Sequence, residues 1–130
     1  MENIGFGIMC FGEEKYFRGT VEKLVNLLEK KQQNLCSVFF TAGFPNLQDT
    51  PKIIKELDAH GIDFIEVGLP FSDPLADGTT IQYSSSVALK NGANLDVIFE
   101  QLELLKGKVT APLVLMGYLN QVLKYGEQRF

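Results

Sequence analysis

Two carboxylates stand out as the residues best placed to do chemistry. Glu66 comes near the end of an otherwise apolar run, residues 62–68 (IDFIEVG), so we expect its carboxyl group to be partly desolvated. Desolvation raises the pKa of a carboxyl group towards neutrality, which suits a general acid–base. Asp77 lies in a following stretch rich in proline and aspartate, where a second carboxylate could hold a substrate donor or stabilise developing positive charge.

The residues alone leave other interpretations of this pair open. Paired carboxylates are also compatible with metal binding or with glycoside hydrolysis. A purely structural interpretation is that Glu66 makes an ion pair at a strand end while the loop acids form turns. Without further information, the structural interpretation is favoured over the catalytic one.

Three short apolar runs predict buried β-strands at residues 35–41, 62–68 and 112–117. Helical stretches separate them, and this alternation is typical of a parallel sheet covered by helices. No glycine-rich dinucleotide fingerprint follows the first strand, and the most informative loop follows the second strand at its carboxyl end. We therefore predict an α/β fold of the (β/α)8 TIM barrel class rather than an open doubly wound sheet. Since a whole barrel takes about 250 residues, this chain holds about the first three strand–helix units.

Helices are predicted where apolar residues recur at helical spacing. Their predicted capping or first residues are Thr20, Thr50, Asn94 and Leu119. The first helix has an apolar stripe that includes Val25 and Leu28. Residues 69–91 are rich in Pro, Asp, Gly and Ser, so we expect one long loop there, and loops of that length are usually functional.

Composition excludes several classes of function. Twelve basic against sixteen acidic residues give a net charge of −4, which argues against a nucleic-acid binder. No apolar run approaches the roughly 20 residues of a membrane span, and no secretory signal is expected at the N-terminus. Cys10 and Cys36 fit neither a disulfide scaffold nor a metal-binding spacing, so we predict free thiols in the cytoplasm. Residues 1–19 show no clear period and are left as an unassigned extension before a domain at residues 20–130.

Several connected motifs resemble the tryptophan synthase alpha subunit family. They are TAGFP at residues 41–45, GIDFIEVGLPFSDPLADG at residues 61–78, IQ at residues 81–82 and LMGYLN at residues 115–120. The string PFSDPLADG is highly specific, and the resemblance runs in order from about residue 21 to residue 130. Agreement across several connected elements is much stronger than one short motif.

The resemblance implies a (β/α)8 barrel that cleaves indole-3-glycerol phosphate to indole and glyceraldehyde 3-phosphate, a retro-aldol reaction in tryptophan biosynthesis. By position, Glu66 matches the catalytic acid–base and Asp77 the carboxylate that binds the indole N–H. The resemblance also implies an apolar and aromatic indole pocket, to which it assigns Phe39, Ile81, Met116 and Tyr118. Without the resemblance, these four residues would be read as ordinary barrel core.

The same resemblance implies a partner, the tryptophan synthase beta subunit, in an alpha2-beta2 complex. Pro70 and Asp73 match the loop that contacts this partner, and Asn120 matches a position near the same interface. Indole would pass to the beta subunit, which carries pyridoxal phosphate. The alpha chain itself is expected to need no cofactor and no metal.

Two departures from the family pattern bear on activity. Thr79 replaces the proline that normally follows ADG, so the loop that holds Asp77 is expected to be less pre-organised. Three strands also leave an open parallel edge and lack the late phosphate-binding elements of such barrels. We therefore expect the isolated chain not to turn over substrate. The alternatives are a non-catalytic fragment that binds a beta subunit, or another barrel enzyme with a phosphorylated substrate.

Overall fold

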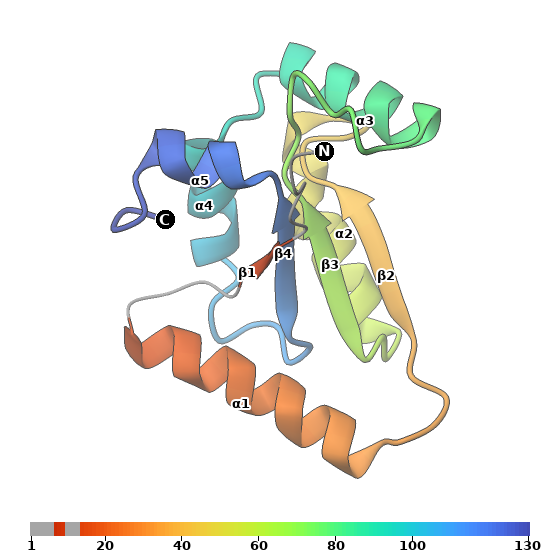
Figure 1. Cartoon of the computed structure of the whole chain (residues 1–130). Helices are drawn as coiled ribbons and strands as arrows, with labels where there is room; N and C mark the ends of the chain where they lie inside the picture. The colour runs from red at the N-terminus through yellow and green to blue at the C-terminus, as the bar shows by residue number, and fades with distance from the viewer. Residues whose placement is uncertain (1–6, 10–13) are drawn as a thin grey trace.

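Three parallel strands form the centre of the structure, a computed structural model that describes residues 7–9 and 14–130 (Figure 1). These strands, β2 (Ser37–Thr41), β3 (Phe64–Gly68) and β4 (Leu113–Gly117), lie side by side in chain order. Residues of β3 pair with both neighbours, so Glu66 lies between Phe39 and Val114. The predicted parallel α/β arrangement is confirmed.

A fourth strand, β1 (Gly7–Met9), pairs antiparallel with β4. It falls within residues 1–19, where the sequence predicts no element, and it covers part of the β4 edge. The expected open edge is therefore wrong on this side of the sheet. Among the described residues, β2 pairs with β3 alone, so the opposite edge keeps unpaired backbone groups.

Five α-helices are described, with a short 3-10 helix, η1 (Leu47–Asp49), before the second. They are α1 (Glu14–Lys30), α2 (Thr50–Ala59), α3 (Thr79–Lys90), α4 (Leu95–Glu103) and α5 (Leu119–Tyr125). Figure 1 shows α3 above the carboxyl ends of the strands and α1 below their amino ends. None of the helices within the described residues is both long and apolar enough to cross a bilayer.

The structure corrects two predicted boundaries. Helix α1 begins at Glu14 and not at Thr20, because a glycine inside a helix costs only about 1 kcal/mol and does not end it. Helix α3 occupies much of residues 69–91, which were expected to be a loop. The last helix begins at Leu119, as predicted, and ends at Tyr125, where Gly126 follows with a φ of 99°.

The face of the sheet that packs on α2 and α4 forms the hydrophobic core. Alternate residues of β3, Ile65 and Val67, point to this face and are fully buried beside Ile54 of α2 and Ile98 of α4. Burial of each such side chain stabilises the fold by about 1.5–3 kcal/mol. The predicted apolar stripe of α1 is not part of this core, since Val25 and Leu28 are nearly half exposed.

A close backbone approach and several hydrogen bonds fix the segment that follows β2. Gly43 has a φ of 85°, and a Cβ atom there would lie 2.7 Å from that of Ala93. The Gly43 N–H donates to the hydroxyl of Thr50, and the amide of Asn91 donates to the carbonyls of Gly43 and Pro45. Thr50 is thus the first residue of α2 and holds the preceding loop, rather than capping the helix as predicted.

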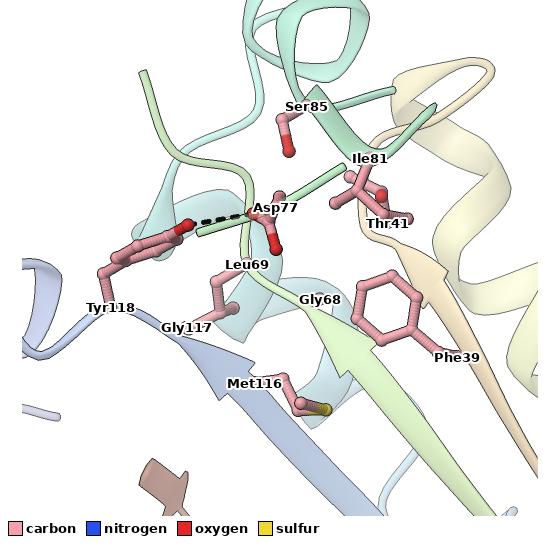
Figure 2. Close-up of a pocket in the computed structure, with 10 residues that line it drawn as sticks. All are labelled: Phe39, Thr41, Gly68, Leu69, Asp77, Ile81, Ser85, Met116, Gly117 and Tyr118. Atoms are coloured by element: carbon pink, nitrogen blue, oxygen red, sulfur yellow. Dashed lines mark hydrogen bonds between the residues drawn. The ribbon is translucent and has the colours of Figure 1, made fainter. Parts of the chain in front are cut away.

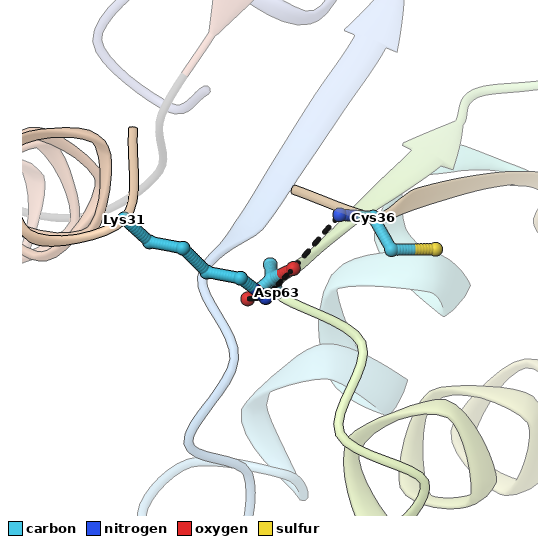
Figure 3. A network of polar contacts seen from close by, with 3 residues as sticks. All are labelled: Lys31, Cys36 and Asp63. Atoms are coloured by element: carbon cyan, nitrogen blue, oxygen red, sulfur yellow. Dashed lines mark hydrogen bonds and ion pairs between the residues drawn. The ribbon is translucent and has the colours of Figure 1, made fainter. Parts of the chain in front are cut away.

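Asp63 ties the amino ends of the sheet to α1 (Figure 3). Its carboxylate accepts two hydrogen bonds of 2.7 Å from Lys31 and one of 2.8 Å from the Cys36 N–H. The Lys31 ammonium and the Cys36 N–H hold the pKa of Asp63 below its ordinary value. One carboxylate therefore links the end of α1, the start of β2 and the start of β3.

Asp58 similarly links the end of α2 to the segment before β4. Its Oδ1 atom accepts hydrogen bonds from the N–H and hydroxyl of Thr110 and from the N–H of Ala111, just before β4. Desolvation acts to raise the pKa of Asp58, but these three donors outweigh it and lower the pKa. Because the folded pKa is depressed, this stabilisation is present above the unfolded pKa of about 3.9 and is lost as the pH falls through the folded pKa.

We predict that Asp58→Asn lowers the free energy of unfolding by about 1 kcal/mol at pH 7, because solvent reaches the carboxylate and weakens its hydrogen bonds. The difference between the two proteins should shrink as the pH falls below about 4, because the unfolded chain then takes up a proton at Asp58 before the folded protein does. Urea unfolding at pH 7, 5 and 3 measures both effects. Glu100→Gln, an exposed site on α4, is the control, and a difference that does not change with pH would contradict the prediction.

Candidate active site

A pocket opens at the carboxyl ends of the three parallel strands (Figure 2). The space between its walls, counted out to the solvent at its open mouth, is about 470 Å³. Its lining residues are Phe39, Thr41, Gly68, Leu69, Asp77, Ile81, Ser85, Met116, Gly117 and Tyr118. The site thus lies where barrel enzymes place their chemistry.

Five of the nine predicted site residues line this pocket, and they come from five separate segments of the chain. They are Phe39 of β2, Asp77 of the loop after β3, Ile81 of α3, Met116 of β4 and Tyr118 beyond it. The spacing along the chain is large, so only the parallel pairing of the strands brings these side chains together.

Tyr118 holds the loop that carries Asp77. Its hydroxyl donates to Oδ2 of Asp77 at 3.1 Å and accepts the N–H of Ala76 at 3.1 Å. Its ring stacks on Phe71, with centroids 4.9 Å apart. One side chain at the end of β4 therefore contacts both halves of residues 70–78.

Two glutamines fasten the same loop at its ends. Gln121 accepts the N–H of Tyr118 and donates to the carbonyl of Pro70. Gln82 of α3 donates to the carbonyl of Asp77 at 2.8 Å. Helix α3 begins at Thr79, which stands where the family pattern has a proline. Proline is favoured at the first position of a helix but is not required there, so its replacement by threonine does not prevent the helix.

The electrostatics of the site centre on Asp77. Desolvation of the half-buried phenol, together with the Asp77 carboxylate, raises the pKa of Tyr118, although the Ala76 N–H acts in the opposite direction. Tyr118 therefore stays protonated and keeps donating to Oδ2. Among the described residues, Oδ1 of Asp77 accepts no hydrogen bond, so this oxygen is available to a ligand donor.

A close contact between Gly68 and Phe39 shapes the pocket floor. A Cβ atom at Gly68 would lie 2.5 Å from the Phe39 ring, so only glycine leaves room for the ring over β3. Phe39 is 38% exposed, which leaves part of its ring open to the pocket. The floor is thus an aromatic surface backed by the β3 backbone.

Glu66 is not among the lining residues of the pocket. It lies two residues before Gly68 on the same face of β3, in register with Phe39. The side chain is half-buried and makes no hydrogen bond or ion pair with another described residue. The structural interpretation of Glu66 as one half of an ion pair is therefore not supported within the described part of the chain.

The residues predicted to contact a partner lie on neighbouring segments. Pro70 is buried, and its carbonyl is bonded to Gln121 of α5. Asp73 is exposed and accepts the Ser72 hydroxyl, while Asn120 is exposed in the first turn of α5. The Pro70–Gln121 bond therefore places the loop and the start of α5 side by side.

Sequence reasoning missed Thr41 and Ser85 as pocket residues. Ser85 lies four residues after Ile81, and residues at that spacing share one face of a helix. A helix prediction for residues 79–90 would therefore have found it. Within the described residues no cluster of His, Cys, Asp and Glu is arranged to hold a metal ion.

Comparison with known proteins places these features in a family. The family model described as tryptophan synthase alpha chain matches residues 24–130. A relative of that name from Christiangramia forsetii is 53% identical over 106 residues, which are 82% of this chain and 41% of the relative. The chain belongs to the tryptophan synthase alpha chain family.

Two further matches agree with this assignment. The tryptophan synthase alpha chain of Parabacteroides distasonis is 46% identical over 110 residues, covering 85% of this chain and 43% of that protein. The crystal structure of tryptophan synthase subunit alpha from Legionella pneumophila matches with a TM-score of 0.74 at 32% identity, over 82% of this chain and 41% of the other. The chain thus spans about two fifths of the length of the curated relatives it matches and has the fold of part of their TIM barrel.

We predict that Tyr118→Phe frees the Asp77 loop while keeping the ring stacked on Phe71. Loss of the hydroxyl removes two hydrogen bonds and should lower the free energy of unfolding by about 1 kcal/mol. Amide hydrogen exchange of Ala76, measured by NMR, should become faster than in the wild type. Tyr83→Phe is the matched control, because Tyr83 is exposed and its hydroxyl makes no hydrogen bond with a described residue. An Ala76 exchange rate equal in all three proteins would show that Tyr118 does not hold the loop.

Proposed function

We propose that this chain forms part of an enzyme that cleaves indole-3-glycerol phosphate to indole and glyceraldehyde 3-phosphate in tryptophan biosynthesis. Membership of the tryptophan synthase alpha chain family supports this function. The observation that carries it is the pocket in which Phe39, Asp77, Ile81, Met116 and Tyr118 converge. A flat apolar ring fits a pocket lined by aromatic and aliphatic side chains, with one carboxylate placed for a ring N–H.

Glu66 serves as the general acid–base in this proposal. The reaction breaks the bond between C3 of the indole ring and the first glycerol carbon, whose hydroxyl loses a proton and becomes the aldehyde. The electron pair of the broken bond returns to the ring, and C3 gains a proton. Glu66, on the same β3 face as the pocket floor, exchanges protons with both positions.

Asp77 stabilises the charge that develops on the ring. Protonation at C3 leaves positive charge near the ring nitrogen, and a carboxylate that accepts the N–H lowers the energy of that state. The free Oδ1 atom supports this role, because Oδ2 is already engaged by Tyr118. Tyr118 fixes the direction of the carboxylate and so acts as a positioning residue.

The 130-residue chain alone is proposed not to turn over substrate. No lysine or arginine is among the described residues that line the pocket, so nothing there neutralises a substrate phosphate. The pocket face of the sheet is also open, as the exposure of Phe39 illustrates. Saturable release of indole by the purified chain would overturn this part of the proposal.

A chimeric protein tests the catalytic assignment directly. Residues 24–130 of this chain would replace the matching segment of the Christiangramia forsetii alpha chain, which is 53% identical over 106 residues. We expect indole release from indole-3-glycerol phosphate, measured spectrophotometrically with and without a beta chain. Glu66→Gln should lower kcat by about 10²–10⁴-fold, because it removes the general acid–base.

Glu56→Gln serves as the control for this substitution, since Glu56 is exposed on α2 away from the pocket. Its kcat should equal that of the unmodified chimera. Indole formation unchanged by Glu66→Gln would remove Glu66 from the mechanism. A folded chimera that forms no indole would instead favour a different barrel enzyme with a phosphorylated substrate.

We also propose that the loop at residues 70–78 and the start of α5 form the surface that binds a tryptophan synthase beta subunit. The Pro70–Gln121 hydrogen bond joins the two segments, and Asp73 and Asn120 are both exposed on them. Leu75 is 86% exposed on the same loop, which suits burial against a partner. Indole formed in the pocket would pass to that subunit, which holds the pyridoxal phosphate, so this chain needs no cofactor of its own.

We predict that Leu75→Ser weakens binding to a beta chain by about tenfold, because one large apolar side chain then no longer becomes buried. Isothermal titration of the 130-residue chain with a purified beta chain measures the affinity. Leu104→Ser is the matched control, since Leu104 is exposed after α4 and away from the loop. Equal affinities of the two variants would contradict the proposed surface. Binding to a beta chain, together with a folded chimera that forms no indole, would support the non-catalytic alternative.

A further inference from the structure

Gln121 joins the start of the Asp77 loop to the end of β4. It is the third residue of α5 and is half-buried. Its Oε1 atom accepts the N–H of Tyr118 at 3.0 Å, and its Nε2 atom donates to the carbonyl of the buried Pro70 at 3.0 Å. An N–H needs an acceptor and a carbonyl needs a donor, so these two partners fix the orientation of the side-chain amide.

One of these two bonds belongs to the helix and the other does not. Glutamine or glutamate at the third helical position often accepts the N–H of the residue before the helix, as one half of a capping box. Glutamate would do this equally well, because a negative charge is favourable at a helix N-terminus. The bond to Pro70, 51 residues earlier in the chain, needs the amide N–H, which glutamate lacks. This second bond gives Gln121 a role outside its own helix.

Gly117 makes room for Gln121 directly behind the pocket wall. A Cβ atom at Gly117 would lie 3.0 Å from Oε1 of Gln121 and 3.0 Å from Cδ1 of Leu69. Gly117 and Leu69 both line the pocket, whereas Gln121 is not among the lining residues. Any effect of Gln121 on a ligand is therefore exerted through the residues that it holds.

Two stacked rings connect Gln121 to Asp77. Phe71 follows Pro70, and its ring stacks on that of Tyr118 with centroids 4.9 Å apart. Gln121 thus holds the backbone on both sides of this stack. The Tyr118 hydroxyl in turn donates to Oδ2 of Asp77 (Figure 2). Loss of the Pro70 bond would let the two rings shift against each other and would change the direction of the carboxylate.

We propose that Gln121 is a positioning residue, whose amide N–H holds the Phe71–Tyr118 stack and thereby aims the Asp77 carboxylate at the ring of the substrate. The amide carbonyl oxygen caps α5, and the amide N–H serves the site. This inference rests on the proposed function, because it gives Asp77 the task of stabilising charge on an indole ring.

The test uses the chimera described above and the substitution Gln121→Glu, which keeps the cap and removes the donor. We expect kcat for indole release to fall by about three- to tenfold, the effect of one hydrogen bond. KM should change by less than about twofold, because Asp77 acts mainly on charge that develops as C3 is protonated.

A double-mutant cycle separates positioning from a purely structural role. Tyr118→Phe removes the hydroxyl through which Gln121 is proposed to act. In a chimera that carries Tyr118→Phe, the addition of Gln121→Glu should lower kcat by less than about twofold further. Equal fold losses of kcat with and without the Tyr118 hydroxyl would overturn the positioning role.

Two further variants control for the charge that glutamate introduces. Gln121→Met removes the donor without adding a charge, and it should lower kcat at least as much as Gln121→Glu does. Gln128→Glu makes the same chemical change at an exposed residue after α5 and should leave kcat unchanged. A Gln121→Met chimera with unchanged kcat would overturn the inference, since the added charge would then explain the loss.

A measurement on the 130-residue chain tests the contact without any turnover. Gln121→Glu should speed amide hydrogen exchange of Ala76 by about three- to tenfold, because the loop is held less firmly. An active chimera in which Gln121→Glu changes neither kcat nor this exchange would overturn the role of Gln121 alone. A folded chimera that forms no indole would overturn the proposed function, and with it the catalytic purpose assigned to Gln121.

Discussion

The parallel register of β2, β3 and β4 is the constraint on which the rest of the structure depends. It sends Phe39, Glu66 and Gly68 to one face of the sheet and the core residues Ile65 and Val67 to the other. A shift of one residue would exchange the two faces, because side chains alternate along a strand. The parallel register also brings the carboxyl ends of the three strands to one edge of the sheet, where α3 and the loop at residues 70–78 can close over them. Pocket and core are thus two consequences of the same backbone pairing.

Tyr118 links this strand register to the position of the Asp77 carboxylate. It stands at the end of β4, yet it bonds Asp77, 41 residues earlier in the chain. The same hydroxyl accepts the Ala76 N–H, and the ring rests on Phe71, so the loop is held by polar and aromatic contacts together. Because Gln121 closes the turn after β4 and reaches Pro70, the α5 junction and the loop form one connected unit. A partner that contacted either segment would therefore act on the direction of the Asp77 carboxylate.

The sequence was sufficient to predict the parallel strands. It was not sufficient to predict the helices and side-chain contacts around them. Continuous apolar runs identify β2, β3 and β4 because each is covered on one face and partly covered on the other. Helix α3 was missed because its serines and threonines compete with the backbone for hydrogen bonds and give little amphipathic pattern, so Ser85 was missed with it. The start of α1 was missed because Gly19 resembles a boundary. The Tyr118–Asp77 bond lay beyond sequence reasoning, since it depends on strand register and loop path together, whereas the family motifs did bring both residues into the site.

The two faces of β3 separate stability from function. Val67 is fully buried under α2 and α4, and its replacement would cost core packing whatever the ligand. Gly68, the next residue, contributes no side chain and instead makes room for the Phe39 ring, so a larger residue there would change the pocket floor before it changed the core. The pocket face presents apolar walls and a carboxylate but, among the described residues, no cationic side chain, so under the proposed function it contacts the ring of the substrate and not its phosphate. Ring recognition and phosphate recognition would therefore be divided between separate parts of the barrel, with this chain supplying the former.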